Sequence, residues 1–128
     1  MKLLLDTHSF MWWDSESARL SRKALALMKS EENSLLVSVV SLWEIQIKRK
    51  IGKLDYDVPL REMIESQQQK SGIIVLPVTL EHIVALDSLP DYHRDPFDRL
   101  LIAQASVEQV TLVTHDPVIA RYPVQTIW

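Results

Sequence analysis

Four acidic side chains stand at positions from which they can reach one another in a sheet of parallel strands. Two follow apolar runs typical of buried strands, residues 3–5 and 111–113, and two lie in or near the starts of predicted helices. Ligands of open parallel sheets bind at the carboxyl ends of the strands, so we expect the four carboxylates to converge there. The four residues are Asp6, Glu44, Asp98 and Asp116.

Carboxylates that converge repel one another and raise one another's pKa values unless a cation lies between them. A hard divalent ion with oxygen ligands resolves this repulsion, which indicates Mg²⁺, with Mn²⁺ as a substitute. Helix N-termini help to keep Glu44 and Asp98 ionised. We therefore expect metal-assisted hydrolysis of a phosphodiester by water, with Asp6 and Asp98 as inner ligands. Asp116 and Glu44 then hold a second ion or orient water, and the number of ions stays open.

Each of these acids except Asp6 also has an ordinary structural interpretation. Glu44 ends a capping-box pattern, SLWE, and stands four residues before a lysine with which it can pair. Asp95, followed by a proline, fits a helix N-cap, and Asp98 in the first turn is favoured by the helix dipole. Asp116 precedes a proline and can begin a turn. Asp6 stands apart, because a carboxylate that ends an apolar strand is costly beside a core.

Apolar runs and helix-type periodicities alternate along the chain, which is typical of an α/β fold. The pattern predicts a mostly parallel sheet covered by helices on both faces. Strands are expected at residues 2–5, 34–37, 73–78, 111–113 and 124–127, and helices at 21–32, 39–51, 59–70, 79–89 and 97–108. The most exposed loops are expected at residues 56–59 and 89–96.

The composition is that of an ordinary globular protein. The chain has 128 residues and no composition shift, so we expect a single domain over residues 1–128. The absence of cysteine excludes thiolate metal sites and cysteine nucleophiles. No stretch approaches the ~20 apolar residues of a membrane span, and we expect a cytoplasmic protein without membrane contact. The formal charge of -3 means that nucleic acid would be bound through a local patch or a metal.

Four stretches of the sequence together resemble PIN-domain proteins, specifically the VapC-like toxins of type II toxin–antitoxin pairs. They are LLLDTHSFMWW, SVVSLWEIQIKRKIGKL, LPDYHRDPFDRLLIAQA and TLVTHD, in the family's order and over nearly the whole chain. The resemblance implies a three-layer α/β/α sandwich, Mg²⁺-dependent ribonuclease activity, usually a homodimer, and a small antitoxin that blocks the site. The family's acidic positions fall on Asp6, Glu44, Asp116 and, in the DRLLIAQA helix, Asp98 rather than Asp95.

Three further residues are expected to support the acids. Thr7 and Thr114 can hydrogen-bond a metal-bound water or a carboxylate, and Asp95 belongs to the HRDPFDR signature of this subgroup as a cap. The position between Thr114 and Asp116 varies among such proteins, so His115 leaves the match intact.

Basic residues near the predicted site can steer phosphate, and a solvated charged face is the competing interpretation. Of the adjacent Trp12 and Trp13, we expect one to pack in the core and the other to contact a partner chain or an antitoxin. His82 and His93 are expected at the surface or in loops, and no histidine is required as a metal ligand. The basic residues proposed for RNA are Lys48, Arg49, Lys50, Lys53, Arg94 and Arg99.

Two other α/β families are disfavoured by the residues after the first strand. An aspartyl phosphatase needs a second acid two positions after the first, where this chain has His8. A phospho-receiver domain needs adjacent acids there and a lysine after the last strand, and the sequence supplies neither. The remaining alternative is a catalytically silent PIN fold that binds RNA or protein, against which the intact set of four acids speaks.

Overall fold

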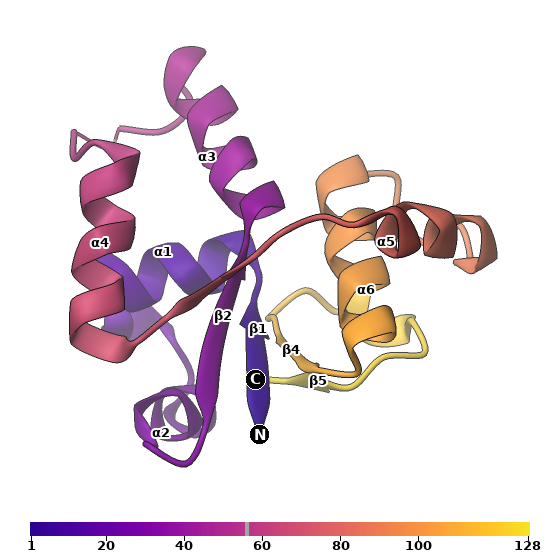
Figure 1. Ribbon diagram of the computed structural model, residues 1–128, viewed down its shortest axis with the longest axis horizontal. Coiled ribbons are helices and arrows are strands. Elements are labelled where there is room, and N and C mark those ends of the chain that lie inside the picture. The colour runs from indigo at the N-terminus through magenta and orange to yellow at the C-terminus, as the bar shows by residue number, and fades with distance from the viewer. Residues whose placement is uncertain (56) are drawn as a thin grey trace.

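A five-stranded sheet forms the centre of the protein (Figure 1). The computed structural model describes residues 1–55 and 57–128, so Tyr56 of the expected 56–59 loop lies outside the described residues. The strands are β1 (Lys2–Leu5), β2 (Ser34–Ser38), β3 (Ile74–Leu76), β4 (Thr111–Val113) and β5 (Thr126–Ile127). They lie in the order β3-β2-β1-β4-β5, and all four pairings are parallel, which confirms the predicted sheet. β3 and β5 are shorter than expected, and Pro77, which lacks an amide hydrogen, follows the end of β3.

Helices connect these strands. They are α1 (Thr7–Ser15), α2 (Arg22–Lys29), α3 (Val39–Lys50), α4 (Leu60–Ser71), α5 (Leu80–Ala85) and α6 (Pro96–Glu108), with the 3₁₀ turns η1 (Ser17–Arg19), η2 (Leu86–Ser88) and η3 (Ile119–Arg121). The expected 79–89 helix is divided into α5 and η2. The sequence pattern gave no bounds for α1, because its apolar residues 10–13 are consecutive and show no helical period. Within residues 1–55 and 57–128, no helix is long and apolar enough to cross a bilayer.

Alternate side chains of β1 enter the two halves of the core. Leu3 and Leu5 pack with Phe10 of α1 in one apolar cluster, whereas Leu4 packs with Ile102 of α6 in the other. The helices α1, α2 and α4 lie on one side of the sheet, and α5 and α6 lie on the other (Figure 1). Because β1 is buried on both faces, its sequence is a continuous apolar run. The expected layers, helices on both faces of a parallel sheet, are confirmed.

The sheet register brings the residues that follow three strands to one edge. Leu5 of β1 lies opposite Val37 of β2 and opposite Val113 of β4. The next residue of each strand, Asp6 among them, therefore lies at the carboxyl edge. The helices α1 and α3 begin at this edge, and the turn that carries Asp116 leaves from it.

His82 is fully buried, which corrects the expectation that it lies at the surface or in a loop. The amide of Thr79 donates to its Nδ1 at 3.0 Å, so Nε2 carries the proton and faces Oε2 of Glu108 at 3.0 Å. Gln104 of α6 lies 3.4 Å from the same ring and accepts from the hydroxyl of Ser38 at 2.5 Å. These bonds satisfy a polar side chain inside the core, which residue type alone does not indicate.

Candidate functional site

Asp6 ends β1 and caps α1. Its amide donates to the carbonyl of Val113 in β4 at 3.1 Å, which fixes the residue beside the neighbouring strand. Its Oδ1 accepts from the amide of Ser9 at 2.8 Å, and the residue is 7% exposed. The sequence interpretation missed this capping role because α1 had no predicted bounds.

Asp95 and Asp98 divide the start of α6 between them. Oδ1 of Asp95 accepts from the amides of Phe97 and Asp98, at 2.8 and 3.3 Å, and Pro96 occupies the first helical position. The predicted cap is therefore confirmed. Oδ2 of Asp98 lies 3.0 Å from Nε2 of His93. The cap fixes the turn from which the Asp98 side chain extends.

Asp116 is held in a tight turn after β4. Its amide donates to Oγ1 of Thr114 at 3.1 Å, and its Oδ1 accepts from the amide of Val118 at 2.8 Å. This confirms the expected turn. Thr114, which we expected to contact a carboxylate or a water, bonds the backbone of the residue that carries the carboxylate. Thr114 thus positions Asp116.

Glu44 does not open α3, contrary to the prediction. The helix begins at Val39, because Ser38 at the end of β2 caps it by accepting from the amide of Val40 at 3.0 Å. Glu44 therefore lies in the second turn, outside any capping box with Ser41 and beyond the strongest influence of the helix dipole. The chain passes from β2 directly into α3, so the helix starts earlier than the SLWE pattern indicates.

Side chains from α1 and α3 hold Glu44 in place. The residue is 5% exposed, its Oε1 accepts from the hydroxyl of Thr7 at 2.6 Å, and its Oε2 lies 2.7 Å from Nζ of Lys48. The expected pair four residues apart is confirmed, as is the contact of Thr7 with a carboxylate. Glu44 is consequently fixed through both of its oxygens.

The structure brings the four carboxylates together around one pocket of about 410 Å³ at the carboxyl edge of the sheet. Two histidines, a tryptophan and a lysine complete much of its wall. The acidic residues that line it are Asp6, Glu44, Asp95, Asp98 and Asp116. Five acids, from the helices α3 and α6 and from the ends of β1 and β4, thus face a space large enough for an ion and part of a substrate.

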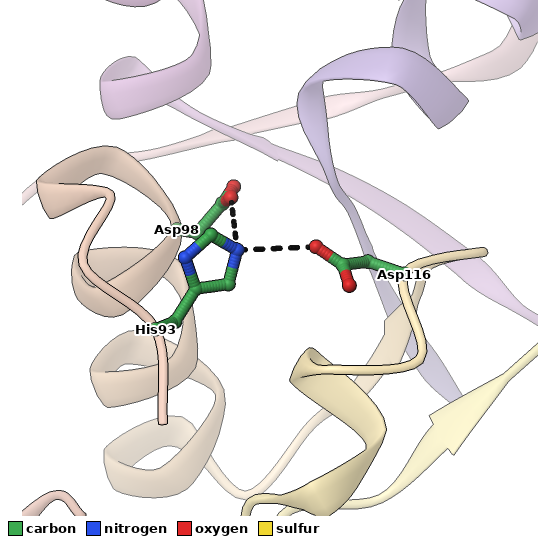
Figure 2. A group of neighbouring side chains, drawn as sticks. All are labelled: His93, Asp98 and Asp116. Atoms are coloured by element: carbon green, nitrogen blue, oxygen red, sulfur yellow. Dashed lines mark hydrogen bonds and ion pairs between the residues drawn. The ribbon is translucent and has the colours of Figure 1, made fainter. Parts of the chain in front are cut away.

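His93 joins two of these acids, as Figure 2 shows. Its Nε2 lies 3.0 Å from Asp98 and 3.1 Å from Asp116. Its Nδ1 accepts from the amide of Asp95 at 3.2 Å, so the proton is on Nε2 and points at the two carboxylates. The loop position of His93 was expected, but these contacts were not. Its nearness to the capping Asp95 in HRDPFDR is the sequence signal that could have suggested them.

Comparison with known families identifies this fold. Residues 3–125 match the family model of the PIN domain. The chain belongs to the PIN-domain family. Ribonuclease VapC22 of Mycobacterium tuberculosis is 28% identical to it over 115 residues, which are 89% of this chain and 86% of the relative.

Solved structures share the architecture of this PIN domain at low sequence identity. VapBC2 from Rickettsia felis, bound to a DNA fragment from its promoter, superposes with a TM-score of 0.74 at 17% identity, over 99% of this chain and 98% of the other. FitAcB from Neisseria gonorrhoeae does so with a TM-score of 0.65 at 16% identity, over 98% and 96% of the chains. At these identities the likeness establishes the parallel α/β fold.

The carboxyl group of Asp98 in this PIN domain has a pKa raised from 3.8 to about 7. Burial is the largest cause, and the negative charge of Asp95 is the next. Glu44 and Asp6 raise this pKa further, whereas His93 lowers it. The repulsion expected of converging carboxylates is therefore present at Asp98.

The donor set of the PIN domain fits a divalent cation. One ligand atom from each of His93, Asp98 and Asp116 lies within 4.8 Å of the other two. Asp6 and Glu44 line the same pocket. Carboxylate oxygens suit a hard divalent cation, and His93, whose Nε2 carries a proton, holds two of the carboxylates rather than the ion itself. Burial and the neighbouring carboxylates raise the pKa of Asp98, and a bound ion would favour its ionised form.

The predicted basic residues fall into two groups. Lys48 pairs with a site carboxylate, and Arg49 and Arg99 donate to backbone carbonyls, those of Val58 at 2.6 Å and Pro90 at 2.8 Å. These three hold protein groups in place. The others are exposed to solvent, namely Lys50, Lys53 and Arg94.

Both adjacent tryptophans are half-buried and pack against the same core cluster, and the expected contact of one of them with a partner chain stays a prediction. Nε1 of Trp13 donates to Oε1 of Gln67 in α4 at 2.9 Å. Trp12 lies against Trp128 with ring centroids 5.8 Å apart.

Proposed function

We propose that this PIN domain is a metal-dependent endoribonuclease, a hydrolase of RNA phosphodiester bonds (EC 3.1) that uses Mg²⁺ and accepts Mn²⁺ in its place. The observation that carries the proposal is the pocket lined by four carboxylates, among which Asp98 has a raised pKa. A divalent ion bound there would polarise the phosphate and lower the pKa of a water molecule. The similarity to VapC22, a ribonuclease, supports RNA as the substrate.

The four acids take different parts in this proposal. Asp6 and Asp98 are the inner metal ligands, and Asp116 and Glu44 hold a second ion or orient the attacking water. His93 fixes the separation of Asp98 and Asp116 through its shared Nε2–H. Without such second contacts, the affinity of a site for its metal typically falls about 10–100-fold.

Supporting residues restrict the motion of these acids. Thr7 and Lys48 hold both oxygens of Glu44, and Thr114 holds the turn of Asp116. Because these contacts exist before substrate arrives, little reorganisation is needed at the moment of reaction.

RNA contacts are proposed for the exposed basic residues around the pocket. Lys53 lines a second groove, which adjoins the acidic pocket at Thr7, His8 and Lys48. The other two exposed residues of the set are Lys50 and Arg94. Neutralising Lys50 and Lys53 together should weaken RNA binding and flatten its salt dependence, since each phosphate contact releases bound counterions.

We further propose that the protein is the toxin of a type II toxin–antitoxin pair and acts in the cytoplasm, inhibited by a small antitoxin protein. The support is the likeness of the fold to VapBC2 and to a toxin–antitoxin complex from Klebsiella pneumoniae, the latter with a TM-score of 0.60 at 14% identity over 98% and 96% of the chains. Co-expression with the product of a short neighbouring reading frame should relieve growth arrest and copurify with this chain.

A homodimer is also proposed, and α5 provides an apolar surface for it. Leu80, Ile83 and Val84 are 72%, 46% and 55% exposed and lie at helical spacing on one side of α5. Such a stripe is costly in water unless another surface covers it. Light scattering during gel filtration should give twice the chain mass, and Ile83→Glu with Val84→Lys should give the monomer.

RNA cleavage in the presence and absence of metal tests the nuclease proposal. Purified protein should cut single-stranded RNA with Mg²⁺ or Mn²⁺ and stop when EDTA is added. Asp98→Asn should be inactive, whereas Asp87→Asn, at an exposed residue of η2 that does not line the pocket, should cut normally. A protein that binds Mn²⁺ and RNA without cutting would instead be the silent binding module.

A further inference from the structure

A series of stacked rings runs beside the acidic pocket. His8 of α1 stacks on Trp12 with ring centroids 5.6 Å apart and an interplanar angle of 28°. Trp12 lies 5.8 Å from Trp128, which in turn stacks on His115 at 4.8 Å and 7°. We call these four residues the ring ladder. It joins α1, the turn after β4 and the end of the chain.

The ring ladder borders both the proposed catalytic pocket and the larger groove. His8, Trp12 and His115 line the pocket that holds Asp98 and Asp116. His8 and Trp12 also line the adjoining groove of about 1070 Å³. A chain that extends from the acidic pocket into the adjoining groove would lie against these rings.

The two ends of the ladder differ from its middle in exposure. Trp12 and Trp128 are half-buried and packed against the core, which anchors the ladder. His8 and His115 are exposed, and among the described residues no hydrogen bond or ion pair ties either imidazole. Neither ring is needed for core packing or for a local polar contact. Their outer faces are therefore available to a ligand.

We propose that His8 and His115 form a stacking site for nucleobases of single-stranded RNA that flank the phosphate held in the acidic pocket. Bases of unpaired RNA bind on the faces of aromatic and imidazole side chains, and every base offers such a face. Arg19, whose guanidinium lies 5.5 Å from the centre of the Trp12 ring, and exposed Lys53 are basic residues of the adjoining groove, which four acids, Asp14, Glu16, Asp55 and Asp57, also line. This inference rests on the proposed ribonuclease function and adds to it a contact that positions the substrate through its bases.

Binding of two RNA hexamers to the cleavage-deficient Asp98→Asn protein tests the proposal. One hexamer carries six adenines, and the other has the same sugar–phosphate chain with abasic positions, so that the two differ only in the presence of the bases. The adenine hexamer should bind roughly fivefold more tightly or better, since stacking is worth about 1–3 kcal/mol per base. The double substitution His8→Ala with His115→Ala should remove that advantage and leave the affinity for the abasic hexamer unchanged.

Two further variants separate stacking from damage to the fold. His8→Phe with His115→Phe keeps flat ring faces and should restore the preference for the adenine hexamer. Trp43→Ala, which removes a side chain 60% exposed that lines neither the pocket nor the groove, should leave the preference intact. Circular dichroism should show that all variants fold.

The outcomes distinguish failure of the stacking site from failure of the nuclease proposal. Equal binding of the two hexamers, or a preference that survives the double alanine substitution, would overturn the stacking site even while the unsubstituted protein cuts RNA. If the unsubstituted protein neither cuts RNA nor binds either hexamer, the nuclease proposal fails and the stacking site fails with it.

Discussion

His82 and His93 make the same contact in two regions of the molecule with opposite surroundings. Each has Nδ1 accepting from a nearby backbone amide and Nε2 at 3.0 Å from a carboxylate oxygen. The His82 side chain is 1% exposed and faces one carboxylate, that of Glu108. The His93 side chain is 20% exposed and faces two, with further acids around the same pocket.

The difference lies in the balance of donors and acceptors. Around His82 each donor has an acceptor, which is the condition for a polar group to stabilise a core. Around His93 several carboxylates share one pocket, and their repulsion adds to burial, the largest cause, in raising the pKa of Asp98. The polar groups around His82 are paired within the protein, whereas the carboxylates around His93 are suited to an added cation.

The largest expected effect comes from removing one charge from the pocket. Asp98→Asn should lower RNA cleavage by at least roughly a hundredfold, beyond the loss typical of a supporting contact. Its unfolding free energy near neutral pH without metal should stay the same or rise, because a buried, repelled carboxylate has been neutralised. Cleavage assays and urea denaturation measure the two quantities, and a large loss of stability would show that Asp98 is structural.

His82→Ala should have the opposite pair of effects, a loss of stability without a loss of metal binding. It removes the acceptor of the Thr79 amide and leaves a cavity at a fully buried position, and should cost about 2–4 kcal/mol of unfolding free energy. Mn²⁺ affinity measured by calorimetry below the melting temperature should not change. A matching drop in Mn²⁺ affinity would mean that the two histidine regions are not independent.

The next largest expected effect is a pH dependence of stability, which should arise at Asp98 in the region of His93 and not in the region of His82. The pKa of Asp98 is about 7 in the folded metal-free protein against an ordinary value of 3.8. Protonated Asp98 therefore favours the folded state, and this contribution is full below about pH 4 and is lost as the pH rises through about 7. A bound cation reverses the preference, since it needs the ionised carboxylate.

Metal titrations at several pH values test this sign. Affinity for Mn²⁺ should fall by up to about tenfold per pH unit below pH 7, because one proton competes with the ion. The rise in melting temperature on adding Mn²⁺ should be greater near pH 8 than near pH 5.5. His82→Ala should show the same pH dependence as the unsubstituted protein, and a flat profile would contradict the placement of the ion beside Asp98.

The sequence alone predicted the features that local signals encode. The apolar run before Asp6, the cap at Asp95 and the alternation of strands and helices led to the sheet and to the acids at its edge. The predicted helix over residues 39–51 starts where α3 starts, whereas the capping-box interpretation of SLWE placed Glu44 in the first turn, and Glu44 lies in the second.

Contacts between distant segments could not be predicted in this way. His82 is satisfied by residues 26 and 22 positions away, and His93 reaches Asp116 across 23 positions. Residue type does not show which of the two histidines is buried, because distant segments supply the partners of each ring. The ring ladder likewise depends on Trp128 meeting α1, which residue spacing does not indicate.

The smallest expected effect tests the division between cap and ligand in HRDPFDR. Asn is as good an N-cap as Asp, so Asp95→Asn should change the unfolding free energy by less than about 0.5 kcal/mol. Because the charge of Asp95 raises the pKa of Asp98, its removal should move the acid limb of Mn²⁺ binding to lower pH. Cleavage should fall by less than about tenfold, as for a supporting residue. If Asp95→Asn and Asp98→Asn lose cleavage equally while both proteins stay folded, Asp95 is itself a metal ligand, and the cap at α6 belongs to the catalytic set.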